Sequence, residues 1–177
     1  METLETLQFQ VVNQEDLPRH LFGAVKTKAY AVLDGASNPA LLDHLYCDGI
    51  RPEFECLYRG ELEPDMAECA PYLVCLEQGS AFTEWLLANC YGNHWGIFAL
   101  SPAGFREVFR HFRKHNMVFD ENGNSPLYFR YYDPRVLRQV IMLFSKEQLT
   151  DFFGQVTAFF TEGVDVNKHF RFDLAGQ

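Results

Sequence analysis

The chain has 177 residues, of which 47% are hydrophobic, and this is enough for one domain with a buried core. Its formal net charge of −9 at pH 7 opposes binding of nucleic acid, because a negative surface repels the phosphate backbone. The sequence has no apolar run of about 18 residues and no signal-peptide pattern, so we expect a cytoplasmic protein without membrane insertion.

The first part of the chain predicts an alternation of helices and strands. Asp16, Leu17 and Pro18 precede an apolar spacing that is typical of a short helix. Helices are also expected to begin at Asn38 and at Ser80, since both side chains can accept hydrogen bonds from a helix N-terminus. Apolar runs bounded by turn residues predict strands over residues 30–33, 54–58, 71–76 and 95–100.

A strongly amphipathic helix is predicted to open at Ser101-Pro102. Its apolar stripe has the i, i+3, i+4, i+7 spacing and consists of Phe105, Val108, Phe109 and Phe112. Its basic residues lie away from that stripe and are Arg106, Arg110, Arg113 and Lys114. They form a basic segment in an otherwise acidic chain. This face is either a solvated helix surface or a docking surface for an acidic partner.

The next segment predicts a β-hairpin around residues 117–131 that leads directly into a helix. Asn122-Gly123 suits the turn of the hairpin, and the aromatic residues up to Tyr131 favour a strand. Asp133 can cap the following helix, and Pro134 suits its first turn.

The end of the chain predicts one short helix and two strands. Ser145 and Gln148 have the spacing of a capping box, and strand-like runs follow over residues 156–160 and 168–172. Together with the earlier elements, this order predicts an α/β fold in which helices flank a mixed sheet.

Candidate catalytic and metal-binding patterns are weak. Gly79-Ser80 lacks the second glycine of a nucleophile elbow, and Gly92 separates Cys90 from His94. His111 and His115 share a helix face but have no third ligand in sequence. The five cysteines, an odd number without CxxC spacing, favour a reducing compartment. We therefore expect no enzymatic activity, no metal and no cofactor.

Short blocks spaced along the chain resemble a bacterial protein family. The blocks cover residues 30–36, 57–62, 70–74, 95–98 and 129–137. In this order they look like the pattern of the type VI secretion effector chaperones, also called adaptors. The resemblance spans about residues 29–155.

The resemblance implies a cytoplasmic, non-catalytic protein that binds one toxic effector and helps to load it onto the VgrG spike. It also implies a core domain over residues 29–155. Residues 1–28 would then be a variable N-terminal segment, and residues 156–177 a strand-like C-terminal extension that could add an edge to a partner's sheet. Recognition of the individual effector is expected in these two flanking segments.

The residues that carry the resemblance have structural roles when they are considered one by one. Gly35 suits a turn after a strand, and Trp95 suits a core. Arg130 and Arg135 can pair with Asp34 or Asp133 and brace the joint between strand and helix. The full set of motif residues is Asp34, Gly35, Tyr58, Trp95, Gly96, Arg130, Asp133, Pro134 and Arg135. Partner binding is therefore expected at the basic helix and not at the motif.

Two alternatives from other classes remain open at the level of sequence. The chain could be an immunity protein that binds and inhibits a toxin, a role that an acidic single-domain protein can also have. It could also be a small cytosolic hydrolase or transferase with a site that the sequence does not reveal.

Overall fold

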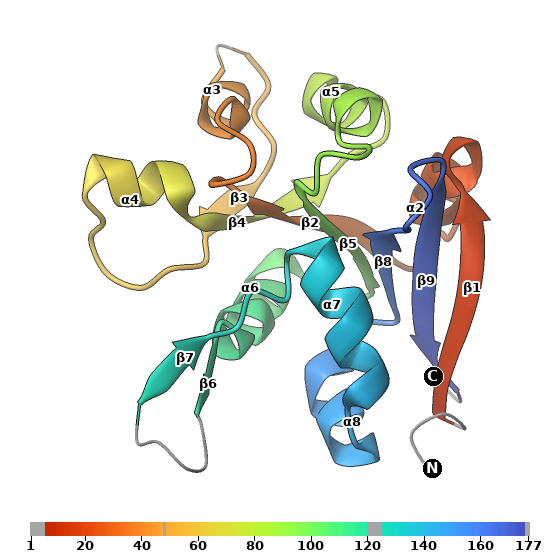
Figure 1. Cartoon of the computed structure of the whole chain (residues 1–177). Helices are drawn as coiled ribbons and strands as arrows, with labels where there is room; N and C mark the ends of the chain where they lie inside the picture. The colour runs from red at the N-terminus through yellow and green to blue at the C-terminus, as the bar shows by residue number, and fades with distance from the viewer. Residues whose placement is uncertain (1–5, 48, 120–124, 176–177) are drawn as a thin grey trace.

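The computed structural model describes residues 6–47, 49–119 and 125–175 and contains a seven-stranded sheet with helices on both faces (Figure 1). The strand order is β1-β9-β8-β5-β2-β4-β3. The strands are β1 (Leu7–Asn13), β2 (Lys28–Asp34), β3 (Phe54–Cys56), β4 (Pro71–Leu76), β5 (Gly96–Ser101), β8 (Ala158–Glu162) and β9 (Lys168–Leu174). The predicted α/β class with flanking helices is thus confirmed.

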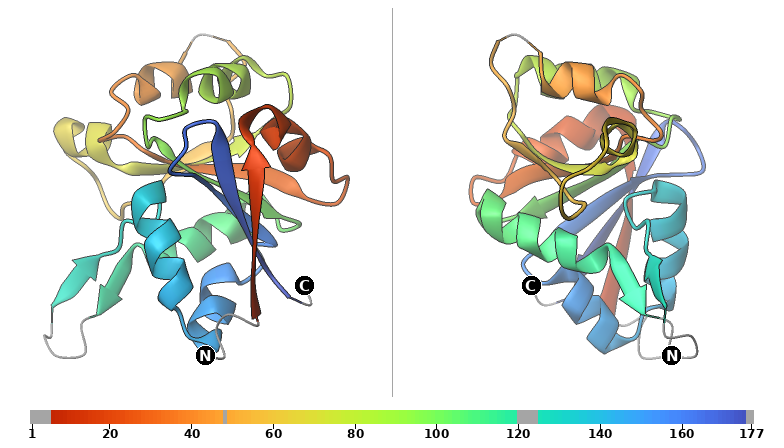
Figure 2. Two further views of the ribbon diagram at one scale, coloured as in Figure 1. Left: turned by 45° about the vertical axis from the view of Figure 1, so that its right-hand side comes forward. Right: turned by 90° about the vertical axis from the view of Figure 1, so that its left-hand side faces the viewer.

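The helices divide between the two faces of the sheet. One face packs against α2 (Leu17–Phe22), α3 (Leu41–Leu45) and α5 (Ala81–Asn89), and the other against α6 (Phe105–His115), α7 (Pro134–Val140) and α8 (Lys146–Phe153) (Figures 1 and 2). A further helix, α4 (Pro64–Cys69), precedes β4, and short 3-10 turns occupy Gln14–Asp16 and Ile141–Leu143. Across the described ranges, no helix is both long and apolar enough to span a membrane.

The sheet is antiparallel, which corrects the expectation of a mixed sheet. Every pairing recorded between the strands described here runs antiparallel. The alternation of strands and helices suggested parallel crossover units. However, the strands that such units would pair are not neighbours in the sheet: β4 lies between β2 and β3, and β2 lies between β4 and β5. The connections through α3 and α5 each skip one strand, so the neighbouring strands of the described sheet run antiparallel.

Both faces of the sheet are covered, and this explains the continuous apolar strands. Along β2, Tyr30 and Val32 belong to the core beneath α6, α7 and α8. Ala29, Ala31 and Leu33 belong to the core on the other face. Because successive side chains of a strand alternate in direction, a strand buried on both faces has no polar positions.

The local signals for helix ends are largely confirmed. The Ser80 side chain accepts a hydrogen bond from the Thr83 amide, and Ser145 and Gln148 form the predicted capping box. Helix α6 begins at Phe105 and not at Ser101-Pro102, because Ser101 is the last residue of β5 and Gly104 is the N-cap.

The predicted hairpin is present, although its second strand is shorter than expected. Strands β6 (Met117–Phe119) and β7 (Pro126–Tyr128) pair antiparallel, whereas the expected turn at Asn122-Gly123 lies outside the described residues. The strand does not continue to Tyr131. This ring is fully buried, and its hydroxyl donates to the Phe112 carbonyl oxygen at 2.9 Å. Because the Tyr131 ring is buried in the core, the chain leaves the strand before the helix begins.

The two flanking segments complete the same sheet as the central residues. The sequence did not predict β1, which pairs with β9 over its whole length. Strand β9 also pairs with β8, and β8 with β5. The C-terminal strands therefore lie inside the sheet, and the expectation that they offer a free edge is wrong. The free edge on this side is β1.

Candidate functional site

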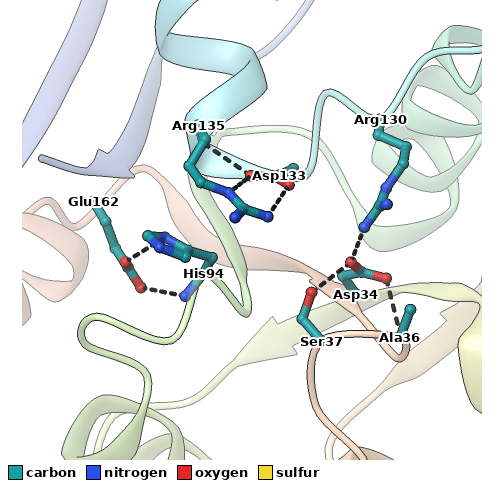
Figure 3. A network of polar contacts seen from close by, with 8 residues as sticks. All are labelled: Asp34, Ala36, Ser37, His94, Arg130, Asp133, Arg135 and Glu162. Carbon is teal, nitrogen blue, oxygen red and sulfur yellow. Dashed lines mark hydrogen bonds and ion pairs between the residues drawn. The ribbon is translucent and has the colours of Figure 1, made fainter. Parts of the chain in front are cut away.

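The motif residue Asp34 organises a polar network at the end of β2. Its side chain is 1% exposed and accepts hydrogen bonds from the Ala36 amide at 3.1 Å and from the Ser37 hydroxyl at 2.6 Å. Arg130 reaches across to the same carboxylate from the segment before α7 (Figure 3). A buried carboxylate with three donors is a stable structural centre, because its charge is paired and its oxygens are satisfied.

A second ion pair forms the start of α7. The Asp133 carboxylate accepts from the Arg135 amide at 2.9 Å and also binds the Arg135 guanidinium, with Nη2 at 2.8 Å. Burial alone would raise the pKa of Asp133, but the hydrogen bonds from Arg135 outweigh it and hold this pKa below its usual value. Arg130 thus pairs with Asp34, and Arg135 with Asp133, two of the pairings that the sequence allowed. Pro134 occupies the first turn of this helix, as expected.

Glu162 and His94 complete the network beside this joint (Figure 3). The Glu162 carboxyl group accepts from the His94 amide at 3.3 Å, and its other oxygen lies 3.2 Å from His94 Nδ1. Burial raises the pKa of Glu162 to about 7 and lowers the pKa of His94, with Arg135 adding to the second effect. Both pKa shifts favour the uncharged forms of Glu162 and His94.

This network does not contain an activated nucleophile. The nearby thiol of Cys90 is buried, and burial raises its pKa to about 12, so the reactive thiolate is scarce at neutral pH. Within the described part of the chain, no group of three or more His, Cys, Asp or Glu side chains is placed to hold a metal ion. The Asp34–Arg130 pair connects the end of β2 with the segment before α7, and Arg138 of α7 donates to the Glu162 carbonyl oxygen at the end of β8.

The remaining motif residues are explained by packing. A Cβ atom on Gly35 would lie 2.2 Å from the Glu68 carbonyl oxygen, and one on Gly96 would lie 2.2 Å from the Val32 carbonyl oxygen. The Trp95 ring stacks on Trp85 with centroids 5.3 Å apart, and Tyr58 packs on Tyr128 at 5.6 Å. Gly35 and Gly96 are therefore required by close backbone approach and not by chemistry.

The predicted basic surface lies on α6, but most of its charges already have partners. Arg106 lies 3.7 Å from Glu55, and Lys114 pairs with Asp151. The Arg113 guanidinium donates to the Tyr58 carbonyl oxygen at 2.8 Å and covers the Phe109 ring. Among the described side chains, Arg110 has no acidic partner and donates to the Arg106 carbonyl oxygen. Of the four basic residues on α6, Arg110 is therefore best placed to bind an acidic group of a partner.

The largest feature that the sequence did not reveal is an exposed apolar arm formed by the β6–β7 hairpin. Both strands are exposed at every position, and Phe119 retains 75% of its accessible surface. The members of this arm are Met117, Val118, Phe119, Pro126, Leu127 and Tyr128. The arm projects from the end of α6, away from the main sheet (Figures 1 and 2). The available signal was the absence of polar alternation in both strands of the hairpin.

An apolar groove lies at the base of this arm. Its volume is about 390 Å³, and its lining residues are His115, Val118, Phe129, Val140, Phe144, Gln148, Asp151 and Phe152. The rings of Phe129, Phe144 and Phe152 pack against one another, with centroids 5.5 to 6.3 Å apart. Because Val118 belongs to both the arm and the groove, the two form one continuous apolar surface, here called the arm–groove surface.

Comparison with known proteins gives a family match and nothing more specific. A family model described as a domain of unknown function, DUF4123, matches residues 29–151. This span covers more than two thirds of the chain and nearly coincides with the motif-bearing segment. No curated protein matches the chain, and no solved structure matches it.

Proposed function

The chain belongs to the DUF4123 family, and from that premise we propose that it is a non-catalytic cytoplasmic adaptor for a secreted toxin. In this role it binds one type VI secretion effector and promotes the loading of that effector onto the VgrG spike. The specific role rests on the motif blocks, which resemble those of the type VI effector chaperones. It needs no cofactor and no nucleic acid.

The observation that carries the proposal is the arm–groove surface. Single exposed apolar side chains are common, but a contiguous set that includes aromatic rings marks a protein-interaction site. An adaptor needs such a surface, because burial of apolar area supplies most of the affinity between proteins. Phe119 and Tyr128, at 75% and 65% exposure, are the expected anchors on this chain.

Replacement of Phe119 and Leu127 by aspartate is expected to reduce capture of the effector by about tenfold or more. Two buried charges would face the partner's apolar surface, whereas the fold loses little because both side chains are exposed in the free chain. The measurement is affinity purification of the tagged chain from the bacterium that encodes it, followed by identification of the bound proteins. A toxin and a VgrG-type spike protein are expected with the unmodified chain.

The control is Val25→Asp, which places one such charge on a fully exposed apolar residue between α2 and β2. This variant should capture the same proteins as the unmodified chain. The adaptor role is wrong if neither a toxin nor a spike protein is captured. The assignment to the arm–groove surface is wrong if the Phe119, Leu127 variant captures both at the unmodified level.

The toxin activity of the purified complex also distinguishes an adaptor from an immunity protein. An adaptor leaves the toxin active when the two are co-purified, because the toxin must act after delivery. An immunity protein abolishes that activity. Loss of toxin activity in the purified complex, without a spike protein, would therefore favour the immunity role. Turnover of substrate by the chain alone would instead point to a hydrolase.

Charge reversal on α6 tests the contribution of the basic residues. Arg106→Glu together with Arg110→Glu is expected to slow association with the effector several-fold at low salt, since exposed charges at a rim act mainly on the association rate. The measurement is the association rate at low and at high ionic strength. Charge reversal at Lys146, which lies on α8, changes the net charge by half as much and is the control for a charge change outside α6. Equal rates for all three proteins would exclude the basic face from the interface.

A further inference from the structure

The outer edge of β1 is an unpaired sheet edge. Strand β1 is the first in the strand order, and among the described strands it pairs with β9 alone. It lies on the side of the molecule opposite to the β6–β7 arm (Figure 1). An edge strand presents a row of backbone N–H and C=O groups that another extended chain can bind.

The register of the β1–β9 pair identifies which backbone groups face outward. The Ala175 amide donates to the Thr6 carbonyl oxygen, and the Gln14 amide donates to the Asn167 carbonyl oxygen, each within 2.9 Å. Both bonds join residues in the register of the ladder, in which Gln8 faces Asp173 and Gln10 faces Arg171. In an antiparallel ladder, hydrogen-bonded and non-hydrogen-bonded pairs alternate.

The even-numbered residues of β1 therefore direct their backbone groups toward β9. The odd-numbered residues, Leu7, Phe9, Val11 and Asn13, direct theirs away from the sheet. No hydrogen bond from another described residue reaches the backbone of Phe9 or Val11. An incoming strand would find alternating donors and acceptors at the spacing that a ladder requires.

The side chains beside this edge add an apolar strip. Phe9 and Val11 point to the same face of the sheet and are 50% and 47% exposed. The Phe9 ring lies 5.0 Å from Phe170 and 5.6 Å from Phe172, measured between ring centroids. An added strand would continue this strip and cover the exposed side of Phe9 and Val11. Its own apolar residues would have to occupy alternate positions.

Strand β1 also lacks the usual protection of an edge. Natural edges are shortened, bulged, or interrupted by proline or charged residues. β1 has 7 residues with no charge, no proline and no glycine, and its pairing with β9 is continuous. The opposite edge, β3, has 3 residues with Glu55 at its centre. The β3 edge is thus protected against strand addition, whereas the β1 edge is open to it.

We infer that β1 binds an extended segment of a partner polypeptide, which adds to the sheet as a further strand. The segment carries apolar side chains at alternate positions and basic residues at the end that meets Glu15, which is exposed directly after β1. A partner with basic residues is favoured over a second copy, because a second copy brings a further net charge of −9. This inference does not depend on the adaptor role or on the arm–groove surface.

Amide hydrogen exchange of the whole chain, followed by NMR, tests the inference. In the free protein, the amides of Phe9 and Val11 are expected to exchange much faster than those of Gln8 and Gln10. The probe is a peptide of about ten residues that alternates valine and threonine and begins with two lysines. At saturation it should slow exchange at Phe9 and Val11 by about tenfold or more.

Substitutions at Val11 test whether the peptide binds through the outward backbone groups of β1. Val11→Pro removes an outward N–H without removing a bond to β9, and it should weaken peptide binding by about tenfold or more. Val11→Thr keeps the N–H and the branched shape and should bind like the unmodified chain. Val11→Lys keeps the N–H but repels the basic peptide, so it should also bind weakly even if Val11→Pro disturbs the strand.

Four outcomes would overturn the inference. The edge is not available if Phe9 and Val11 are already protected in the dilute free protein. The edge does not bind strands if the peptide leaves both amides unprotected, or if Val11→Pro and Val11→Lys bind it normally. Protection that appears on concentrating the protein without peptide would assign the edge to a second copy and not to a partner.

Discussion

Gly96→Ala is expected to lower the free energy of unfolding by about 3 kcal/mol or more. The added Cβ would lie 2.2 Å from the Val32 carbonyl oxygen and 2.9 Å from Leu33 Cδ2. Strand β2, which carries Val32, is held between β4 and β5 and cannot move away without breaking both ladders. Urea unfolding, followed by fluorescence of the two tryptophans, measures the change.

Gly104→Ser is the matched control for this substitution. No atom lies within 4 Å of a Cβ at Gly104, and its φ of −71° suits any residue. Serine is also a good N-cap, so this variant should be as stable as the unmodified chain or slightly more stable. An unfolding midpoint for Gly96→Ala equal to that of the control would show that close packing is not the reason for glycine at position 96.

Acidification is expected to remove about 3 kcal/mol of stability through His169 alone. This side chain is fully buried, its ring nitrogens have no partner among the described residues, and burial lowers its pKa to about 4. The unfolded chain, with an ordinary histidine pKa, binds the proton more readily. The contribution is therefore present above about pH 6.5 and is lost as the pH falls toward about 4. His115, whose pKa burial also lowers to about 4, acts in the same direction.

Protonation of Glu162 on acidification has the opposite effect on the free energy of unfolding. Burial raises its pKa to about 7, so between the ordinary glutamate pKa and 7 the folded chain binds more protons than the unfolded chain. Its contribution to stability is present at low pH and is lost as the pH rises through about 7, with a total of about 3 kcal/mol. The two effects overlap between about pH 4.5 and 6.5 and partly cancel in the unmodified protein.

Single substitutions separate the two effects. The free energy of unfolding is measured at about pH 8 and about pH 5 for each protein, and the difference between the two values is compared. His169→Phe should lose about 2 kcal/mol less than the unmodified chain on going to the lower pH. Glu162→Gln should lose about 3 kcal/mol more over the same interval, because the unmodified chain gains from protonation of Glu162. Identical differences for all three proteins would show that neither group titrates abnormally.

The sequence carried strong information about local structure. Ser80, Asp133 and the Ser145–Gln148 pair each marked a helix start, because a capping side chain and its target amide are close along the chain. The apolar stripe of α6 was visible for the same reason. The pair of Arg135 with Asp133 is local to this helix start, whereas the pair of Arg130 with Asp34 joins two distant motif blocks and was one of the pairings that the sequence left open.

Long-range relations were less accessible. Strand direction depends on the path of the connecting segments through space, and residue spacing along the chain does not record that path. The pairing of His94 with Glu162 joins residues 68 positions apart, and nothing local to either residue indicates it. The partners of the basic helix, Glu55 and Asp151, were hidden in the same way.

The sequence by itself determined where α5, α7 and α8 begin, which strands are apolar on both sides, and which family the motif blocks resemble. Only the tertiary structure decided which apolar residues are covered. Met117–Phe119 and Pro126–Tyr128 are as apolar as a core strand, yet they are exposed because no other described element packs over them. The same holds for the edge at β1, where Phe9 and Val11 lie at the end of the strand order. Burial depends on what lies across the fold, and this is the reason that candidate binding surfaces emerged only from the three-dimensional arrangement.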